Sequence, residues 1–326
     1  MKKQTGHSLS KKSFLSTPTL LIITAAVVGL VILGIWTVSN PQDDSPSSNN
    51  SSNANQPSIE MAHIHGLGFS SDGRELYVPA HYGVVVFSDN RWSILDIPVN
   101  DYMGYTPVDN GFYSSGHPGV GTDLINPLGL VKSTDGGRTL TTLDFSGESD
   151  FHVMGVGYKN HALYVLNPSP NTILSAGMYY SLDDGVTWQP CRAEGMSGEV
   201  LQIAVHPANA NVVAVATANG VFLSQDYGAT FESIGESAPT TAVAFDANGE
   251  SLFFGYQALQ RYSLATEQIE TLSTPTLDAE NGINYIALNP VSAEIAFATL
   301  SKDIYLSKAI GQTWEQIAQQ GIGHNL

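Results

Sequence analysis

Cysteine and basic residues are both scarce in this sequence. The single cysteine, Cys191, excludes an intramolecular disulfide, so the folded body must be stable without one. Only 13 Lys and Arg oppose 30 Asp and Glu, and the formal charge is −17. Four of the lysines lie in the first 12 residues, which leaves 9 basic against 30 acidic side chains, or −21, for the rest. Such a body repels phosphate backbones and attracts cations, which excludes nucleic acid as a partner.

Several motifs of known chemistry are also absent. The sequence has no glycine-rich phosphate loop and no Gly-x-Ser-x-Gly turn around a nucleophilic serine. Helical periodicity is absent after residue 58. The 31 glycines and the 42% apolar content are instead typical of a turn-rich all-β protein.

The N-terminal residues predict a membrane anchor. Residues 20–38 form an uncharged apolar run, just long enough to cross a bilayer as a helix. The preceding lysines favour a cytoplasmic N-terminus. We therefore expect a cytoplasmic basic tail (1–18), a single-pass transmembrane signal-anchor (19–38), a disordered linker (39–58), and a body (59–320) outside the cytoplasm at the cell membrane, ending in a tail (321–326). A cleaved signal peptide is the alternative.

One eight-residue pattern, Ser-x-Asp-x-Gly-x-Thr-aromatic, organises the body. It is complete at 181–188 and at 224–231, and at 133–140 a leucine takes the aromatic position. At 307–314 the Asp is replaced by Ala309. The copies begin 48, 43 and 83 residues apart, and a period of this size predicts a repeat architecture.

The chemistry of the pattern is that of a tight hairpin. The carboxylate can accept hydrogen bonds from the backbone of its own turn, and the glycine supplies a positive φ. The Thr and the aromatic residue then lead into the next strand. We expect structural roles for Asp135, Gly137, Asp183, Gly185, Trp188, Asp226, Gly228, Gly311 and Trp314. The pattern resembles the Asp-box, or BNR, repeat of sialidase-like and sortilin-like β-propellers, a resemblance that implies a fold rather than an activity.

The body divides into six units of four short strands, which predicts a six-bladed β-propeller. The count becomes seven if a divergent blade lies within the long second unit. We expect the innermost strands at 63–69, 102–108, 151–158, 201–205, 241–245 and 284–288.

Propeller topology predicts where the histidines lie. The start of each inner strand and the loop between the second and third strands share one face of the ring. Five of the nine histidines fall there, together with two carboxylates and two methionines: His63, His65, His81, His117, His152, Asp101, Asp150, Met103 and Met154. We expect His161 and His206 to be ordinary surface residues on the opposite face.

Three functions remain open for this rim. Imidazoles beside carboxylate and thioether groups are ligands for a transition metal, and in that case copper or zinc would be the cofactor, which the sequence does not identify. Hydrogen bonding around a channel mouth is the structural alternative. Binding of a small molecule, a glycan or a protein is the third, and we expect a monomer.

A glycoside hydrolase is the enzymatic alternative. The segments at 63–67, 100–104, 111–118 and 150–152 resemble those of bacterial exported Asp-box proteins identified by similarity as glycosyl hydrolases. Asp101 and Asp150 would be the catalytic pair. Sialidase activity is not expected, because a sialidase needs three convergent arginines and the chain has only five arginines, mostly placed elsewhere. We therefore predict a binding module, with the hydrolase and a scaffold for protein assembly as alternatives.

Overall fold

The computed structural model describes residues 58–326, which belong to one compact unit and contain 25 strands and no helix. None of these residues forms a helix that could span a membrane. The expected basic tail (1–18), signal-anchor (19–38) and nearly all of the linker (39–58) lie outside the described residues.

The strands form six antiparallel sheets, numbered here as blades 1 to 6 in chain order. Blade 1 contains β1 (Gly68–Phe69), β2 (Leu76–Ala80), β3 (Gly83–Ser88) and β4 (Arg91–Ile94). Blade 2 contains β5 (Asp101–Val108), β6 (Gly111–His117), β7 (Leu130–Ser133) and β8 (Thr141–Asp144). Blade 3 contains β9 (Met154–Val156), β10 (Leu163–Asn167), β11 (Gly177–Ser181) and β12 (Gln189–Pro190).

The second half of the chain continues the same plan. Blade 4 contains β13 (Val200–Val205), β14 (Val213–Thr217), β15 (Gly220–Ser224) and β16 (Glu232–Ile234). Blade 5 contains β17 (Ala242–Phe245), β18 (Ser251–Gly255), β19 (Leu259–Ser263) and β20 (Ile269–Thr271). Blade 6 contains β21 (Ile283–Leu288), β22 (Ile295–Thr299), β23 (Ile304–Ser307), β24 (Glu315–Gln319) and β25 (Ile322–Gly323).

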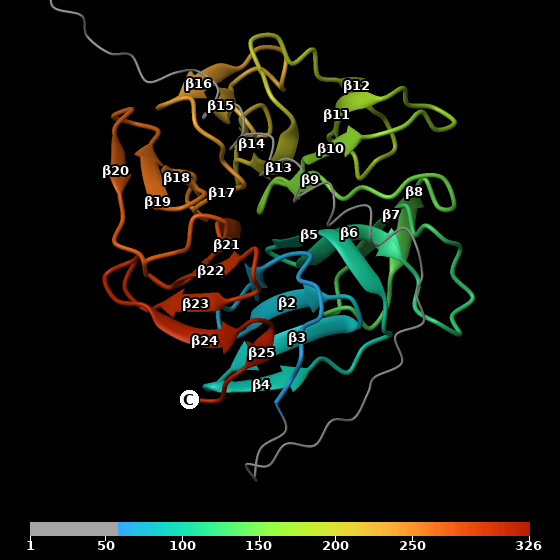
Figure 1. Ribbon diagram of the computed structural model, residues 1–326. Coiled ribbons are helices and arrows are strands. Elements are labelled where there is room, and N and C mark those ends of the chain that lie inside the picture. Colours follow the sequence, from blue (N-terminus) through green and yellow to red (C-terminus); the bar gives the residue numbers. More distant parts are fainter. Residues whose placement is uncertain (1–57) are drawn as a thin grey trace, which may run out of the picture. The chain divides into compact units, whose positions relative to one another are not determined.

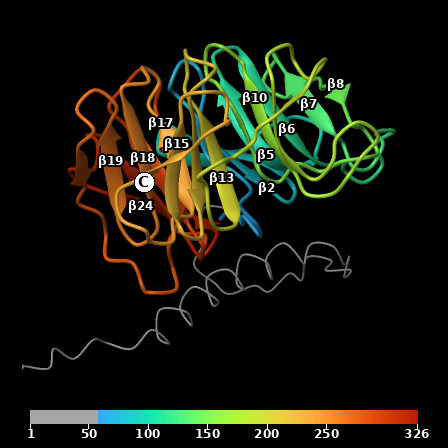
Figure 2. The same ribbon diagram turned by 90° about the horizontal axis from the view of Figure 1, so that it is seen from above.

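The blades close into a ring. Figure 1 shows β5, β9, β13, β17 and β21 nearest the centre and the fourth strand of each blade outside, and Figure 2 shows the ring edge-on. The hydrophobic core is divided into six clusters, and each cluster joins two neighbouring blades. Because the cluster around Leu76 and Ile317 joins blade 1 to blade 6, the ring is complete. The structure is therefore a six-bladed propeller, without a seventh blade in the second unit.

The chain ends fasten this last interface. Ile322 and Gly323 pair with β24 as a fifth strand, and Glu60 bridges Ile322. The backbone N–H of Met61 donates to the carbonyl of Gly321 at 2.7 Å. Residues 321–326, expected to be a tail, therefore carry a strand of blade 6. Their short length and low apolar content hid this strand from the sequence pattern.

The eight-residue pattern forms the turn between the third and fourth strands. In the copy at 181–188, the Ser181 hydroxyl accepts from the N–H of Gly185 at 2.9 Å. The Asp183 carboxylate accepts from the backbone N–H of Thr187 at 2.8 Å and from its hydroxyl at 2.7 Å. The expected positive φ is confirmed at Gly137, Gly185, Gly228 and Gly311, with values between 74° and 91°.

The aromatic position also has a packing role. Trp188 and Trp314 each come directly before the fourth strand of a blade. Trp188 packs against the cluster between blades 2 and 3, with its ring centroid 5.7 Å from that of Phe145. Trp314 packs on Phe297 at 4.7 Å. The pattern thus ties each hairpin to the interface between blades.

Two expected inner strands are shorter in the structure: in blade 3 only Met154–Val156 of the expected 151–158 pairs as a strand. In blade 1 only Gly68–Phe69 pairs as a strand, although the expected element began at residue 63. His63 to His65 still follow β2, because the N–H of His65 donates to the carbonyl of Pro79 and Ile64 bridges Ala80. The start of the chain's first blade is therefore an irregular segment that carries two histidines to the channel mouth.

Candidate functional site

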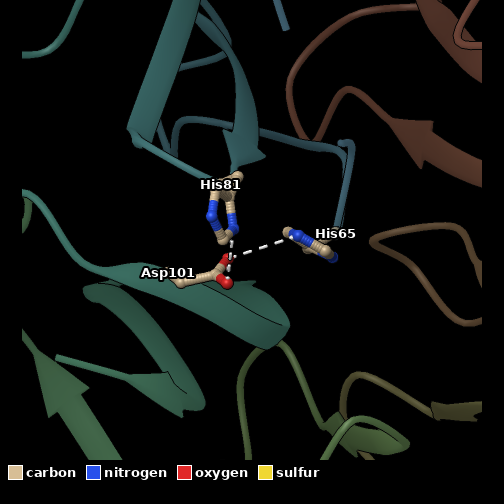
Figure 3. Close-up of side chains that lie close together, drawn as sticks. All are labelled: His65, His81 and Asp101. Carbon is tan, nitrogen blue, oxygen red and sulfur yellow. Dashed lines mark hydrogen bonds and ion pairs between the residues drawn. The ribbon is translucent and has the colours of Figure 1, made fainter. Parts of the chain in front are cut away.

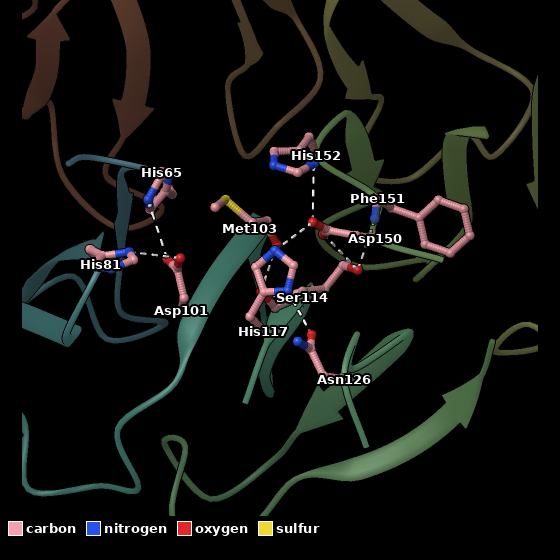
Figure 4. A network of polar contacts seen from close by, with 11 residues as sticks. His65, His81, Asp101, Met103, Ser114, His117, Asn126, Asp150, Phe151 and His152 are labelled. Atoms are coloured by element: carbon pink, nitrogen blue, oxygen red, sulfur yellow. Dashed lines mark hydrogen bonds and ion pairs between the residues drawn. The ribbon is translucent and has the colours of Figure 1, made fainter. Parts of the chain in front are cut away.

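Five histidines, two aspartates and one methionine gather at one end of the central channel, as the topology predicted. We call His63, His65, His81, His117, His152, Asp101 and Asp150 the histidine rim. They come from blades 1, 2 and 3 and from the loops beside their inner strands. Figure 4 shows that the rim contains two His–Asp–His groups with Met103 between them.

The first cluster consists of His65, His81 and Asp101. The Nδ1 atom of His81 is hydrogen-bonded to Asp101 Oδ2 at 2.9 Å, and His65 Nε2 lies 3.2 Å from Asp101 Oδ1 (Figure 3). Potential ligand atoms of the three residues all lie within 4.8 Å of one another. The Asp101 side chain is only 7% exposed. The cluster therefore presents two imidazoles and a buried carboxylate to one point.

Two atoms of this cluster lack a hydrogen bond. His65 Nε2 and Asp101 Oδ1 are buried, and although they are 3.2 Å apart neither makes a hydrogen bond. The 3.2 Å separation is that of an ion pair, but the geometry does not form a hydrogen bond between the two atoms. Buried polar atoms without a partner are rare because each costs about 1–3 kcal/mol. These two atoms are thus available to a ligand.

Burial sets the protonation of the first cluster. Burial lowers the pKa of His65 to about 3, with further lowering from the neighbouring histidines. Burial likewise lowers the pKa of His63, helped by His81 and Lys302. Burial raises the pKa of Asp101, and the hydrogen bond from His81 offsets part of that effect. His65 is therefore a neutral imidazole with a free lone pair near neutral pH, the form that binds metals.

His63 stands beside this cluster without belonging to it. Its ring centroid lies 6.1 Å from that of His65 and 5.9 Å from that of His81. The Lys302 ammonium, which donates to the carbonyl of Ala62 at 2.9 Å, fixes the backbone next to it. His63 is thus an exposed neighbour of the first cluster.

The second cluster consists of His117, Asp150 and His152. His117 Nε2 lies 3.1 Å from Asp150 Oδ2, and His152 Nδ1 lies 3.3 Å from the same oxygen. His117 Nδ1 also lies 2.7 Å from Asn126 Oδ1. Both nitrogens of His117 therefore face oxygen atoms, an arrangement that favours the doubly protonated ring. The Asp150 carboxylate correspondingly raises the pKa of His117 to about 9.

These contacts separate the expected metal ligands into two kinds. His117 has no nitrogen left for a metal while it holds Asp150 and Asn126. His152 uses Nδ1 on Asp150 and keeps Nε2 free, as metal-binding histidines commonly do. Met103 lies within the rim, whereas Met154 both packs in the core between blades 2 and 3 and lines the central cavity with His65 and His152. His117 is thus not placed to bind an ion while it keeps these contacts.

The channel behind the rim is narrow. A cavity of about 180 Å³ runs between the inner strands, with His65 and His152 in its lining and Leu67, Ile203 and Tyr285 among its walls. Sites for drug-sized molecules usually measure about 300–1,000 Å³. A sugar would therefore bind on the rim rather than inside the channel.

Some rim contacts were not foreseen from the sequence. Ser115 accepts from the N–H of Phe151 at 2.9 Å and its hydroxyl lies 3.5 Å from Asp150 Oδ1. Asn126, in the long loop after β6, holds His117. Ser115 shares a strand face with His117, and this two-residue spacing was the available signal. The sequence gives no signal for Asn126, because its contact with His117 depends on how the loop after β6 folds back.

The opposite face gives one correction. His161 forms an ion pair with Asp109 at 2.8 Å, as a surface histidine can. His206, expected on the surface, is 6% exposed and holds the turn of its own hairpin by accepting from the N–H groups of Ala208 and Asn209. A hairpin histidine whose ring can accept two backbone N–H groups is drawn inward by its own turn.

Arginines do not converge on the rim. Arg74, Arg192 and Arg261 are paired with Asp72, Glu194 and Glu270 on their own blades or turns, and Arg138 donates to the carbonyl of Asp135. The arginines therefore do not form the three-residue cluster by which sialidases hold a carboxylate.

Comparison with known proteins supports the fold. No protein-family model and no curated protein sequence matches this chain. Among solved structures, an ancestral GH74 enzyme shares 14% identity over 80% of this chain and 39% of its own, with a TM-score of 0.50. The GH74 enzyme of Niastella koreensis shares 14% identity over 79% of this chain and 46% of its own, with a TM-score of 0.54.

A third similar structure is YCF48 bound to a D1 peptide, with 17% identity, coverage of 80% and 83%, and a TM-score of 0.47. The chain spans less than half the length of the two GH74 enzymes. What they share is the fold. At this identity the likeness identifies a β-propeller and assigns no activity.

Proposed function

We propose that the propeller is a binding module for a transition metal ion, copper or zinc, at His65, His81 and Asp101. The observation that carries the proposal is the pair of buried atoms without hydrogen bonds, His65 Nε2 and Asp101 Oδ1, within a three-residue cluster of ligand type. An ion between them would satisfy both atoms at once.

The distances suit such an ion after a small contraction. Bonds from zinc to nitrogen and oxygen are about 2 Å long, so ligand atoms on one ion are at most about 4 Å apart. The potential ligand atoms of the cluster lie within 4.8 Å. Side-chain movements of less than about 1 Å therefore close the site. A bound cation would also keep the buried Asp101 ionised, and the acidic body would concentrate cations near the rim.

Metal content tests the proposal directly. The full chain, purified without a histidine tag and kept in detergent because of its apolar segment, should contain stoichiometric copper or zinc by elemental analysis. Added ion at about 100 times its Kd should stabilise the fold by about 2.7 kcal/mol, which thermal unfolding can detect. Asp101→Asn should abolish both effects for zinc and for divalent copper. His161→Gln, on the opposite face, should retain them. No stoichiometric metal, together with no thermal shift in copper, zinc or manganese, would refute the proposal.

The site is further proposed to lie outside the cytoplasm. The support is the uncharged run at 20–38 and the lysines before it. Protease added to intact cells should then degrade the propeller, and alkaline carbonate should leave the full chain in the membrane fraction. Release of the chain by carbonate would contradict an uncleaved anchor.

A glycoside hydrolase is the second candidate. The observation in its favour is that Asp101 and Asp150 lie on neighbouring blades at one rim, and that burial raises the pKa of Asp101 as a general acid requires. Against it, the Asp101 carboxylate is already hydrogen-bonded to His81, and the Asp150 carboxylate already contacts His117 and His152. Hydrolysis of a glycan panel that is lost in Asp150→Asn would establish the activity. Absence of cleavage by the wild type would remove this candidate.

A further inference from the structure

Three successive blades begin in the same way. A buried hydrophobic residue is flanked by two residues at the channel mouth: His63-Ile64-His65, Asp101-Tyr102-Met103 and Asp150-Phe151-His152. Ile64, Tyr102 and Phe151 are 8%, 0% and 0% exposed and pack between blades. Because side chains alternate along an extended chain, the flanking residues face the other way.

The third residue of each triplet reaches the same level of the rim. His65 and His152 both line the central cavity. Met103 is 2% exposed, so its thioether contacts protein groups rather than water. Figure 4 shows the Met103 side chain between His65 and His152, with the sulfur on the side of His65.

The orientation of His152 suits a ligand. Its Nδ1 atom lies 3.3 Å from Asp150 Oδ2, and the other ring nitrogen points to the side of Met103 (Figure 4). Asp150 is held in turn by His117 at 3.1 Å. A histidine whose one nitrogen binds a carboxylate commonly uses the other on a metal, and such outer partners change metal affinity 10- to 100-fold.

From this placement we infer that His65, Met103 and His152 form a second, softer site, which binds Cu(I). Two imidazoles and a thioether, with no carboxylate, are a ligand set for a soft monovalent ion, whereas the carboxylate of the first cluster favours a divalent one. The inference rests on the proposed function in one respect, since both sites share His65. Because His65 can bind only one ion through a given nitrogen, the two sites cannot both be filled at once. They also select different ions.

The two ligand sets differ in Met103 and Asp101, and substitution of these two residues gives a direct test. The untagged full chain in detergent is titrated anaerobically with Cu(I) against a chromophoric chelator, with Ag(I) as a probe that does not change oxidation state. Met103→Leu should weaken Cu(I) and Ag(I) binding by about tenfold or more and leave Zn(II) binding unchanged. Met178→Leu, the matched change in the core between blades 3 and 4, should alter neither. Asp101→Asn should weaken Zn(II) and retain Cu(I).

X-ray absorption on the wild type makes the test independent of the variants. The Cu(I)-loaded protein should show a sulfur neighbour, and Met103→Leu should lack it. Unchanged Cu(I) affinity in Met103→Leu, or a wild-type spectrum without sulfur, would overturn the inference. Such a result would leave the proposed zinc site at His65, His81 and Asp101 unaffected. Conversely, Cu(I) bound through sulfur without any Zn(II) binding would overturn the proposed divalent site and retain this one.

Discussion

The two carboxylates of the rim have different electrostatic surroundings. Asp101 is buried between two histidines, one of which is held neutral by its burial. Asp150 instead faces His117, whose two nitrogens both contact oxygen acceptors. Asp101 therefore has a neutral imidazole beside it and lacks a positive charge at that side, whereas His117 supplies a positive charge to Asp150. This difference assigns metal binding to the first cluster and an orienting role to His117.

A pH-dependent stability follows for His117. Its pKa is about 9 in the folded state and about 6.5 in an unfolded chain. Because the folded pKa is raised, the stabilisation is complete below about pH 6.5 and is lost as the pH rises through 9. The side chain is 36% exposed, so the pair is partly screened by solvent. His117→Gln should therefore lower Tm by about 2–4 °C at pH 6 and by little at pH 10.

Thermal unfolding of both proteins at several pH values measures this difference. His324→Gln, at an exposed position near the C-terminus, should follow the wild type throughout. A Tm difference between His117→Gln and the wild type that is independent of pH would show that the ring acts by packing rather than by charge.

Residue chemistry explains which parts of the site could be foreseen. The alternation of side chains and the blade topology placed five histidines and two aspartates at one channel mouth. Neither rule specifies rotamers, so the sharing of Asp150 by His117 and His152 was not foreseen. Met154, two residues after His152, lines the central cavity and also packs against Gly104, where β5 is irregular.

At the scale of elements, the eight-residue turns are the clearest link from sequence to structure. Asp135, Asp183 and Asp226 make the same contacts to a Thr four residues later. In the fourth copy Ala309 has no carboxylate, and only the Ser307 hydroxyl still accepts from the turn, including the N–H of Gly311 at 3.0 Å. The chain thus contains its own comparison between turns with and without the carboxylate.

Removal of the carboxylate from one turn and its introduction into another test how much it stabilises the fold. Asp183→Ala should lower Tm by about 2–4 °C, since hydrogen bonds to the backbone and hydroxyl of Thr187 are lost. Ala309→Asp should raise Tm, because Thr313 can donate to the new carboxylate as Thr187 does to Asp183. Thermal unfolding at neutral pH measures both.

The pH dependence of Ala309→Asp provides the control. The turn contacts lower the pKa of Asp135 and Asp226 to about 2, so their stabilisation is present above about pH 4 and lost as the pH falls towards 2. The gain from Ala309→Asp should disappear over the same range. A gain that persists at pH 2, or a loss of stability at neutral pH, would contradict this account of the turn.

At the scale of the whole molecule, the six blades were predictable because each repeats the same local signals. Strand alternation, polar turns and the eight-residue pattern all recur with one period. The closure was not predictable, because it depends on pairing between residues near 60 and residues near 322. Two short segments far apart in the chain carry no local signal of their contact. The fifth strand of blade 6 was missed for this reason.

Closure predicts a large effect for a small deletion. Removal of residues 321–326 eliminates β25 and the hydrogen bond from the Met61 N–H to the Gly321 carbonyl. It also removes the hydrogen bond that the backbone N–H of Trp92 donates to Asn325 Oδ1 at 2.8 Å. The cluster between blades 1 and 6, which includes Met61, Trp92 and Ile317, would then be open at its edge. We expect a fall in Tm well beyond the 2–4 °C of the single-residue changes, with faster amide exchange in blades 1 and 6 than in blades 3 and 4.

A point substitution distinguishes closure from mere loss of chain length. A side chain at Gly323 would meet the Trp92 ring within 2.7 Å, so Gly323→Val should open the same interface with every residue retained. The exchange pattern of Gly323→Val should match that of the deletion, whereas Gly121→Val, which meets no atom within 4 Å and strains only its own loop through a φ of 84°, should leave blades 1 and 6 protected. Uniformly faster exchange in all six blades would instead mean that the ring unfolds as one unit, and that its closure has no weaker point than any other interface.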